Sequence, residues 1–214
     1  MRLLAAADIH GALDVYEWLV ELAREHNAEL VVLAGDLFAG DWADGQRMQA
    51  QQIIARLKRV DVPCFYIMGN DDNVALEYED EQIMPLHGRR LHCGIFSFVG
   101  YEYTPPFLGN AFVKPEAEIE KDLQSLEPLL GEQAILVTHA PAYGTLDQSF
   151  AGEHVGSRSL AALLGRTRVL AHIHGHIHGT FGRHSNHFNV ASAGQRRAIV
   201  IDLPSLDHEV LRAD

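Results

Sequence analysis

Side chains with metal-binding atoms stand directly after several apolar stretches of the chain. The stretch AAADIHG carries Asp8 and His10 after its apolar residues, and VVLAGD carries Asp36. FYIMGND contributes Asn70 and ILVTH contributes His139 in the same way. Taken singly, an Asp or Asn after a strand often only forms a turn, but this series of positions favours a common site. Carboxylate, amide and imidazole groups without a thiolate suit divalent metal ions.

Two neighbouring metal ions in such a site would supply hydrolytic chemistry. Asp36 has two carboxylate oxygens and could therefore bridge both ions. A water held between two cations loses a proton far more easily than bulk water and becomes a nucleophile at neutral pH, while the cations draw charge from an electrophilic oxygen. The residue types thus indicate a metal-dependent hydrolase.

The stretch HIHGHIHG, residues 172–179, adds four histidines at alternate positions. These residues alone leave open which of the four bind metal. Several candidate ligands have a glycine beside them. Glycine is expected there, because a backbone that turns sharply off a strand and passes close to an ion leaves little room for a β-carbon. The glycines concerned are Gly35, Gly69, Gly175 and Gly179.

Alternating strands and helices in the first third of the chain predict how these groups meet. Apolar runs at 2–7, 30–34 and 64–68 have the character of buried strands. The helices between them would carry Leu13, Tyr16, Val20 and Ala23 on one face, and Ala50, Ile53, Ile54 and Leu57 on another. This order predicts a largely parallel sheet, whose binding crevice lies at the carboxyl ends of its strands.

The rest of the chain predicts a mixed arrangement of strands. GIFSFVGYEY (94–103) alternates with period two, which is typical of antiparallel pairing. Further helices are expected at Pro115–Leu130 and Ser159–Leu164, and further strands at 134–138 and 168–173. The C-terminal segment predicts hairpins built from 187–191, 198–203 and 208–211. These elements indicate two sheets that share one core.

Composition narrows the class of protein. The 214 residues fit one domain, residues 1–214. No apolar run approaches the roughly 20 residues that span a bilayer, so no membrane segment is expected. The formal charge of −12 disfavours long nucleic acid as a partner, whereas local metal charge can hold a small anionic substrate. Two cysteines and an N-terminal apolar stretch too short for a signal peptide favour a cytoplasmic location.

The order of the motifs resembles that of the calcineurin-like metallophosphoesterases, whose pattern is D-x-H, G-D, G-N-H, an isolated H and G-H-x-H. In this chain the blocks are Asp8-Ile9-His10, Gly35-Asp36, Gly69-Asn70-Asp71, His139 and Gly175-His176-Ile177-His178. The stretches GNDD, THAPAYGTLD and GEHVGSRSL are similar to the Icc-related predicted phosphoesterases. The resemblance implies an α/β fold: a four-layer α/β/β/α sandwich of two mixed β-sheets flanked by helices, the metallo-dependent phosphatase fold.

The resemblance also implies a centre of two divalent metal ions. One ion would be held by Asp8, His10, Asp36 and His178, and the other by Asp36, Asn70, His139 and His176. Manganese is expected first, with iron, zinc, nickel or cobalt open, because oxygen and nitrogen ligands of this kind do not discriminate sharply. His172 and His174 then belong to the incoming strand, where we expect them to pack or to orient ligands.

One position departs from the family pattern. The family usually has a histidine after the asparagine, thought to protonate the leaving group or to steady the phosphate, and this chain has Asp71. A carboxyl beside two cations is held ionised and donates a proton poorly at neutral pH. His154 or Arg158, in GEHVGSR, is expected either to supply the missing positive group or to be a loop residue at the start of a helix. We hypothesise a preference for good leaving groups or the use of another acid.

The expected function is hydrolysis of a phosphodiester or small phosphomonoester by in-line attack of a metal-bridging hydroxide. The expected catalytic residues are Asp36, Asn70, Asp71, His154 and Arg158. An alternative, motivated by Asp71, is a catalytically weak or silent metal- and nucleotide-binding protein on the same fold. A metal-dependent amidohydrolase ranks last, because its barrel typically needs about 250 residues. Edge strands of the C-terminal hairpins could pair between chains, so a homo-oligomer stays open.

Two further sets of residues are expected to lie outside the site. The histidines in turn-rich stretches are predicted to be surface groups: His87, His92, His184 and His187. The stretch YEYTPPF (101–107) is predicted to be a packed aromatic turn that could border the crevice.

Overall fold

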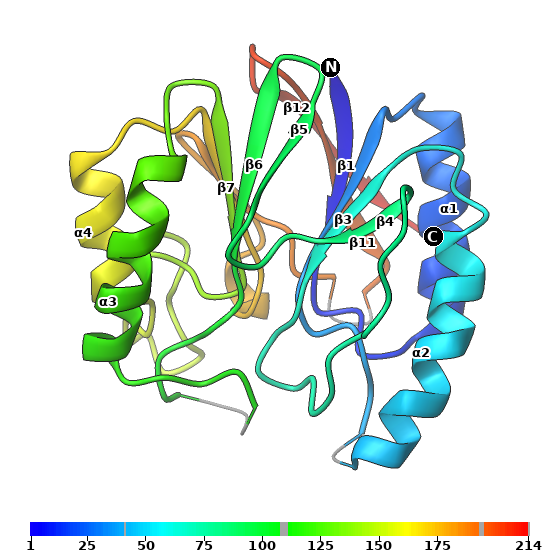
Figure 1. Cartoon of the computed structure of the whole chain (residues 1–214), viewed down its shortest axis with the longest axis horizontal. Coiled ribbons are helices and arrows are strands. Elements are labelled where there is room, and N and C mark those ends of the chain that lie inside the picture. Colours follow the sequence, from blue (N-terminus) through cyan, green and yellow to red (C-terminus); the bar gives the residue numbers. More distant parts are fainter. Residues whose placement is uncertain (41, 108–110, 193–194, 214) are drawn as a thin grey trace.

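The computed structural model describes residues 1–40, 42–107, 111–192 and 195–213. Its helices are α1 (Leu13–Glu25), α2 (Ala43–Leu57), α3 (Glu116–Leu126) and α4 (Arg158–Arg166), with the short 3₁₀ turns η1 (Glu127–Leu129) and η2 (His178–Thr180). The described residues form two six-stranded sheets packed face to face, with α1 and α2 outside one sheet and α3 and α4 outside the other (Figure 1). The predicted four-layer α/β/β/α sandwich is confirmed.

Both sheets are mixed: the first has antiparallel strands at one edge only, and the second has an antiparallel strand at each edge. The first sheet has the order β12 (Asp207–Arg212), β11 (Arg197–Asp202), β1 (Arg2–Ala6), β2 (Leu30–Ala34), β3 (Cys64–Ile67), β4 (Ile83–Pro85). The second has the order β5 (Arg90–Cys93), β6 (Phe96–Tyr101), β7 (Ala134–Thr138), β8 (Ala171–His174), β10 (His187–Asn189), β9 (Gly182–His184). Strands β1 to β4 are mutually parallel, as are β6, β7, β8 and β10. β1 runs downward from the N-terminus in Figure 1, so the carboxyl ends of these strands in the first sheet face the lower edge.

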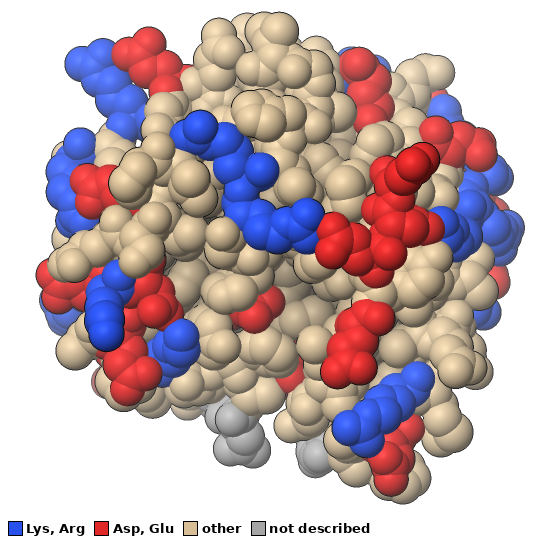
Figure 2. All heavy atoms as spheres, viewed as in Figure 1, with Lys and Arg blue, Asp and Glu red and all other residues tan. Residues whose placement is uncertain are grey.

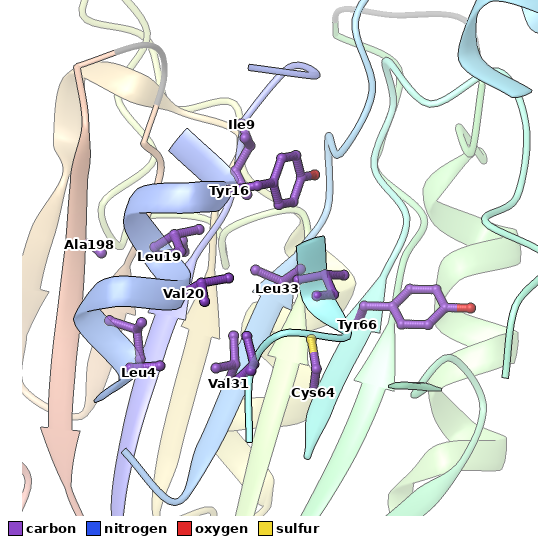
Figure 3. Close-up of a cluster of buried hydrophobic side chains, with 14 of the residues drawn as sticks. Leu4, Ile9, Tyr16, Leu19, Val20, Val31, Leu33, Cys64, Tyr66 and Ala198 are labelled. Atoms are coloured by element: carbon purple, nitrogen blue, oxygen red, sulfur yellow. The ribbon is translucent and has the colours of Figure 1, made fainter. Parts of the chain in front are cut away.

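From Leu3 onward, successive side chains of β1 point alternately into two different cores, which explains why all of them are apolar. Leu4 and Ala6 belong to the core between the sheet and α1, whereas Leu3 and Ala5 belong to the core between the two sheets. Figure 3 shows the first core, where Tyr16, Leu19 and Val20 of α1 face Leu4, Val31 and Leu33 of the sheet. Burial of a side chain of this size contributes about 1.5–3 kcal/mol. A strand covered on both faces therefore needs the continuous apolar pattern seen at 2–7.

A third core lies between the second sheet and its helices. Val99 of β6 and Leu136 of β7 pack in one cluster with Ile119 of α3 and Leu160 of α4. Helix α4 begins after Ser157, whose hydroxyl oxygen accepts a hydrogen bond from the backbone N–H of Leu160 (3.1 Å). This side-chain cap fixes where the helix starts.

The C-terminal strands differ from the prediction. Strands 187–191 and 198–203 do not form a hairpin: β10 lies in the second sheet, parallel to β8 and antiparallel to β9. β11 and β12 do form the predicted hairpin, at the edge of the first sheet. A short apolar strand carries little information about which sheet it joins, because both sheets offer the same buried neighbours. Strands β4, β5 and β9 are too short to show a pattern in the sequence and are not predicted. The strand predicted from residue 168 begins at Ala171.

The surface shows acidic and basic side chains interspersed on the face seen in Figure 2. Arg89 and Arg90, an adjacent pair of basic residues, are engaged within the molecule: Arg89 pairs with Glu79 (2.8 Å), and Nε of Arg90 donates to the carbonyl of Leu129 (2.7 Å). Among the described residues, every helix is too short or too polar to cross a membrane.

Two of the histidines predicted to be surface groups are partly buried. His92 and His184 are exposed, as predicted. Nδ1 of His87 accepts a hydrogen bond from the backbone N–H of Glu102 (3.3 Å), and His187 packs its ring against His172. Turn-rich sequence around a histidine indicates the path of the backbone but not what covers the side chain.

Candidate metal centre

The carboxyl ends of strands from both sheets meet at one edge of the molecule. Asp8 and His10 follow β1, Asp36 follows β2 and Asn70 follows β3, whereas His139 follows β7 and His176 and His178 follow β8. Backbone hydrogen bonds join the two sheets at this edge. The N–H of Ala7 donates to the carbonyl of Val190 (3.0 Å), and the N–H of Ser192 donates to the carbonyl of Ala7 (2.6 Å).

Four of the predicted ligands have a left-handed backbone. The φ angle is +55° at Asp8, +49° at His10, +52° at Asp36 and +70° at His176. A residue other than glycine in such a sparsely populated region costs about 1–3 kcal/mol and persists only where the surrounding structure enforces it. The fold therefore holds these side chains in place at the expense of stability, as is common at functional sites.

Two glycines leave room for ligands that come from another strand. A β-carbon at Gly69 would collide with the carboxylate of Asp36, and one at Gly175 would collide with the carboxylate of Asp8. Close approach thus requires glycine at both positions, as predicted. The prediction is wrong for Gly179, where an added β-carbon would make only an ordinary van der Waals contact at 3.8 Å.

The imidazole of His139 links the two sheets in the buried half of the site. Its Nδ1–H donates to the carbonyl oxygen of Ala34 (2.8 Å), because a carbonyl can only accept. Its Nε2 lies 3.2 Å from Oδ2 of Asp36 and 3.0 Å from Oδ1 of Asn70. Gly35, at φ +94°, makes room for the ring, since a β-carbon there would collide with it. One nitrogen and two oxygens thus converge on one point.

A second group of ligand atoms surrounds Asp8. Its Oδ1 accepts a hydrogen bond from Nε2 of His178 (3.1 Å), and both its oxygens accept from the N–H of His176 (3.1 and 3.0 Å). The ring of His10 lies edge-on to that of His178, with centroids 5.6 Å apart. Ligand atoms of Asp8, His10 and His178 lie within 4.8 Å of one another, as do those of Asp8, Asp36 and His139.

The two imidazole–carboxylate pairs have the geometry of metal-binding groups. Nε2 of His139 lies 3.2 Å from a carboxylate oxygen of Asp36, and Nε2 of His178 lies 3.1 Å from one of Asp8, so each pair offers a nitrogen and an oxygen to one divalent cation. A proton shared by such a pair is displaced when a metal ion binds. The donors are oxygen and nitrogen atoms only, which fits divalent ions.

His176 provides a further sign of an absent partner. Its Nε2 is buried and has no hydrogen-bond partner among the described residues, although buried polar atoms are normally satisfied. Its ring lies beside that of His139, with centroids 5.2 Å apart. The described structure thus gathers at one edge the ligands predicted from the sequence: Asp8, His10, Asp36, Asn70, His139, His176 and His178. Their assignment to two ions stays a prediction.

Burial and charge set the protonation of these groups. Burial and then the neighbouring His139 lower the pKa of His176 to about 4, so its imidazole is neutral at pH 7 and able to bind metal. Burial works against ionisation of Asp36, but His139 outweighs it and the pKa of Asp36 falls below its ordinary value. Burial likewise opposes the charge on His139, but Asp36 raises the pKa of this imidazole to about 10. A hydrogen bond to Asp8 raises the pKa of His178.

Asp71 lies at the rim of the cluster. Its carboxylate is 3.8 Å from Nδ1 of His10 and accepts a hydrogen bond from Nδ2 of Asn70 (2.8 Å). Its N–H donates to Oδ1 of Asp36 (2.9 Å). Burial and then the charge of Asp36 raise the pKa of Asp71. An oxygen of Asp71 also comes within 4.8 Å of ligand atoms of His10 and Asp36, so Asp71 is itself a candidate ligand.

The structure does not bring His154 and Arg158 into the cluster. Nδ1 of His154 bonds to Oδ1 of Asp147 (2.5 Å), and its ring lies beside that of Tyr143. The guanidinium of Arg158 lies 3.8 Å from the centre of the Tyr143 ring, and its backbone N–H donates to Glu116 (2.7 Å). These contacts agree with the second expectation from the sequence, that His154 and Arg158 belong to the loop at the start of a helix and not to the site.

Asp72 is a buried residue of the site that the sequence analysis does not identify. Its carboxylate accepts hydrogen bonds from the N–H groups of Phe38 (2.8 Å) and Gly69 (2.8 Å), and so ties the loop after β2 to the loop after β3. Burial and then the charge of Asp36 raise its pKa to about 8. The second aspartate of GNDD is the only signal in the sequence, and it does not distinguish this role from a surface position.

Two further buried side chains hold ligand segments. Nε2 of Gln46 donates to the carbonyl of Asp71 (2.8 Å). The guanidinium of Arg197 donates to the carbonyls of His178 (2.6 Å) and Ala191 (2.8 Å). Neither residue stands next to a motif, so only the three-dimensional structure connects it with the site.

His172 and His174 are fully buried in β8. Nε2 of His172 bonds to Oγ1 of Thr138 (2.8 Å), and its Nδ1 lies 3.0 Å from Nδ1 of His187. Nδ1–H of His174 donates to the carbonyl of Gly175 (3.2 Å). Burial lowers the pKa of both histidines. They pack within the strand that leads to the ligands, as expected.

A cleft of about 690 Å³ opens over the cluster. Its lining includes Asp36, Asn70, Asp71, His176 and His178, and its walls include Phe107, Phe150 and Glu153. In the stretch 101–107, Tyr101 and Thr104 are buried, in agreement with a packed turn, while Phe107 borders the cleft.

Solved structures with this fold cover the whole chain. TT1561 of Thermus thermophilus matches with a TM-score of 0.79 at 19% identity, over 99% of this chain and 98% of that one. A dimetal phosphatase from Danio rerio matches with a TM-score of 0.67 at 13% identity, over 100% and 99%. A protein described as a novel archaeal phosphodiesterase matches with a TM-score of 0.53 at 12% identity, over 100% of both chains. At these identities the likeness shows the fold.

The sequence comparisons address the family. No curated protein matches the sequence. The family model described as calcineurin-like phosphoesterase matches residues 1–180. This span contains every motif that the structure gathers at the cleft, from Asp8 to His178. The chain therefore belongs to the calcineurin-like phosphoesterase family.

Proposed function

We propose that this chain is a phosphoester hydrolase that depends on two divalent metal ions and acts on a phosphodiester or a small phosphomonoester. The observation that carries the proposal is the convergence of oxygen and nitrogen ligands from both sheets around Asp36, with the unpaired buried nitrogen of His176 in the same site of the described chain. Family membership and the neighbours described as a dimetal phosphatase and a phosphodiesterase support the same class of reaction.

Two bound cations would supply Lewis-acid charge for the phosphate oxygens and a water nucleophile at neutral pH. We assign Asp8, His10, Asp36 and His178 to one ion, and Asp36, Asn70, His139 and His176 to the other. Backbone N–H groups orient the two carboxylates, that of His176 toward Asp8 and that of Asp71 toward Asp36. Manganese is the first candidate, followed by iron, zinc, nickel and cobalt.

The leaving group is where this chain departs from its family. Hydrolysis joins the oxygen of water to phosphorus, breaks the bond from phosphorus to the leaving oxygen, and leaves a proton on that oxygen. Asp71 stands where the family usually has a histidine, and cations beside a carboxylate oppose its protonation. His154 and Arg158 are engaged with Asp147 and Tyr143. We therefore propose that esters whose leaving groups need no protonation are favoured.

Metal analysis combined with an activity screen tests the proposal. Elemental analysis of the purified protein is expected to find two divalent ions per chain. A screen of metals against nitrophenyl esters, cyclic nucleotides and dinucleotides is expected to show metal-dependent hydrolysis. A protein that binds no metal and hydrolyses none of these esters with any of the metals would refute the assignment.

The substitution Asp71→His tests the leaving-group argument. Restoring an imidazole is expected to raise kcat/KM on alkyl phosphodiesters about tenfold or more relative to nitrophenyl diesters, since general acid catalysis typically contributes more than this. Asp44→His, on an exposed side chain of α2, is the matched control. Equal rates of the wild-type protein on both classes of ester would contradict the argument. A loss in His154→Ala confined to alkyl esters would instead assign the acid to His154.

A second candidate function also rests on Asp71. A centre without an effective proton donor can bind metal and nucleotide without turnover. Calorimetric binding of a nucleotide to the metal-loaded protein, with no hydrolysis across the same panel, would favour this function over catalysis.

A further inference from the structure

Two phenylalanine rings stand exposed at the cleft. The side chain of Phe150 is 96% exposed and that of Phe107 is 39% exposed. Large apolar rings are usually covered in soluble proteins, and an exposed group of them at a concave site marks a surface that binds an apolar partner. Both rings line the same cleft as Asp36, Asn70, His176 and His178.

Phe107 contacts a predicted metal ligand, and the exposed ring of Phe150 stands near the same segment. Phe107 meets the imidazole of His176 edge to face, with centroids 6.1 Å apart and an angle of 82° between the planes. The edge of the Phe150 ring comes near Gly179, where an added β-carbon would be 3.8 Å from Cε1. Phe107 follows β6 and Phe150 lies between β7 and α4, so separate loops present the two rings. A group attached to a phosphate at the cluster would therefore reach aromatic surface directly.

Charge around the cleft limits how much negative charge a substrate can carry. Its charged lining residues in the described part of the chain are acidic: Asp36, Asp71 and Glu153, with no lysine or arginine among them. With Asp36 assigned to the metal ions that neutralise one phosphate, further phosphates would meet the carboxylates of Asp71 and Glu153 without a lysine or arginine. A phosphodiester, with one negative charge at its phosphate, fits this lining better than a polyphosphate does.

We propose that the cleft selects phosphodiesters whose retained group, the one that stays on the phosphate after cleavage, is a planar aromatic, and that Phe107 and Phe150 stack on that retained group. A nucleobase and an aryl ring share this chemistry, because both present a flat π face to a phenylalanine. The inference rests on the proposed function, since the phosphate must be held at the metal ligands. It assigns the two phenylalanines to substrate selection and not to bond cleavage.

Three esters with one leaving group separate stacking from chemistry. Thymidine 5′-(p-nitrophenyl phosphate), phenyl p-nitrophenyl phosphate and methyl p-nitrophenyl phosphate all release p-nitrophenolate, so they differ only in the retained group. For the wild-type protein, kcat/KM is expected to be about tenfold or more higher for an aromatic retained group than for methyl, as one stacked ring contributes. Comparison of kcat/KM for the thymidine ester with that for the phenyl ester distinguishes a preference for a nucleobase from a preference for an aryl ring.

Substitutions at the rings test which residues create the difference. Phe150→Ala and Phe107→Ala are expected to reduce the aromatic-to-methyl ratio of kcat/KM toward one, and Phe150→Tyr is expected to keep it. Since Phe150 is almost fully exposed, its replacement is not expected to impair folding. Ile95→Ala is the matched control: Ile95 is 71% exposed before β6, at the opposite end of that strand from the cleft.

The outcomes distinguish this inference from the proposed function. Hydrolysis of all three esters at equal kcat/KM, unchanged by the phenylalanine substitutions, would overturn the inference and leave the proposed function standing. If no ester is hydrolysed, the proposed function fails, and calorimetry on the manganese-loaded protein decides the inference. Adenosine 5′-monophosphate is then expected to bind about tenfold more tightly than methyl phosphate, and the difference is expected to vanish in Phe150→Ala. Equal affinities for the two would overturn it.

Discussion

The two sheets contribute different chemistry to the same centre. The first sheet supplies the oxygen donors, Asp8, Asp36 and Asn70, at the ends of β1, β2 and β3. The second sheet supplies the imidazoles of His139, His176 and His178 at the ends of β7 and β8. His10 is the imidazole that comes from the oxygen-donating side. Neither sheet alone presents the full set of ligands that we propose for two cations.

The two halves are also held together by polar contacts that cross between the sheets. His139 from the second sheet donates to the carbonyl of Ala34 in the first, and the N–H of His176 donates to Asp8. Ala7 and Val190 pair through their backbones at the same edge. Packing of the two sheets therefore brings the oxygen donors and the imidazoles together. A change in one half should therefore be felt in the other.

The largest effect is expected from removing the carboxylate that both halves share. Asp36→Asn leaves the shape of the side chain but removes the charge that faces His139 (3.2 Å) and would lie between two cations. We expect loss of bound metal and a decrease in kcat of about 10³-fold or more. Elemental analysis and steady-state kinetics measure both. Asp44→Asn, at a side chain that is 86% exposed, is the control; retention of both ions by Asp36→Asn would contradict the shared role.

A smaller effect is expected inside the oxygen-donating half. Asp72→Ala leaves the buried N–H groups of Phe38 and Gly69 without an acceptor, at a cost of about 2 kcal/mol in the free energy of unfolding. Asp72→Asn keeps one acceptor oxygen and should cost less. Urea unfolding measures the change, with Asp61→Ala at the surface expected to stay within about 0.5 kcal/mol of the wild type. Equal stability of Asp72→Ala and the wild type would show that the two loops are held by other contacts.

A stability effect of similar size is expected where the halves touch. A β-carbon at Gly175 collides with the carboxylate of Asp8, so Gly175→Ala must push the imidazole segment away from the oxygen donors. We expect a loss of about 1–3 kcal/mol in stability together with weaker metal binding. Gly179→Ala, four residues further on, meets only an ordinary contact and should retain both properties. Identical thermal unfolding and metal affinity for the two variants would argue against a tight contact between the halves.

The sequence predicts the centre better than it predicts the strands around it. The positions of Asp8, Asp36, Asn70 and His139 after apolar runs are informative, because parallel strands end at a common edge. This rule needs only the order of elements, so it succeeds without knowing their pairing. The same local evidence cannot place β10 in the correct sheet, since its apolar pattern fits either one.

The supporting residues escape prediction for a different physical reason. Asp72, Gln46 and Arg197 act through hydrogen bonds to backbone groups far away in the sequence. Residue type and local spacing contain no record of such partners. His154 shows the converse: its position in a suggestive stretch indicates the site, but its bond to Asp147 keeps it elsewhere.

Anomalous diffraction from crystals of the manganese-loaded protein, collected at the manganese edge, tests the central claim most directly. We predict two anomalous peaks in the cleft, one against Asp8, His10 and His178 and the other against Asn70, His139 and His176, with a carboxylate oxygen of Asp36 next to each. Peaks absent from this edge of the sheets, or located between His172 and His187 instead, would contradict a centre assembled from both sheets around Asp36.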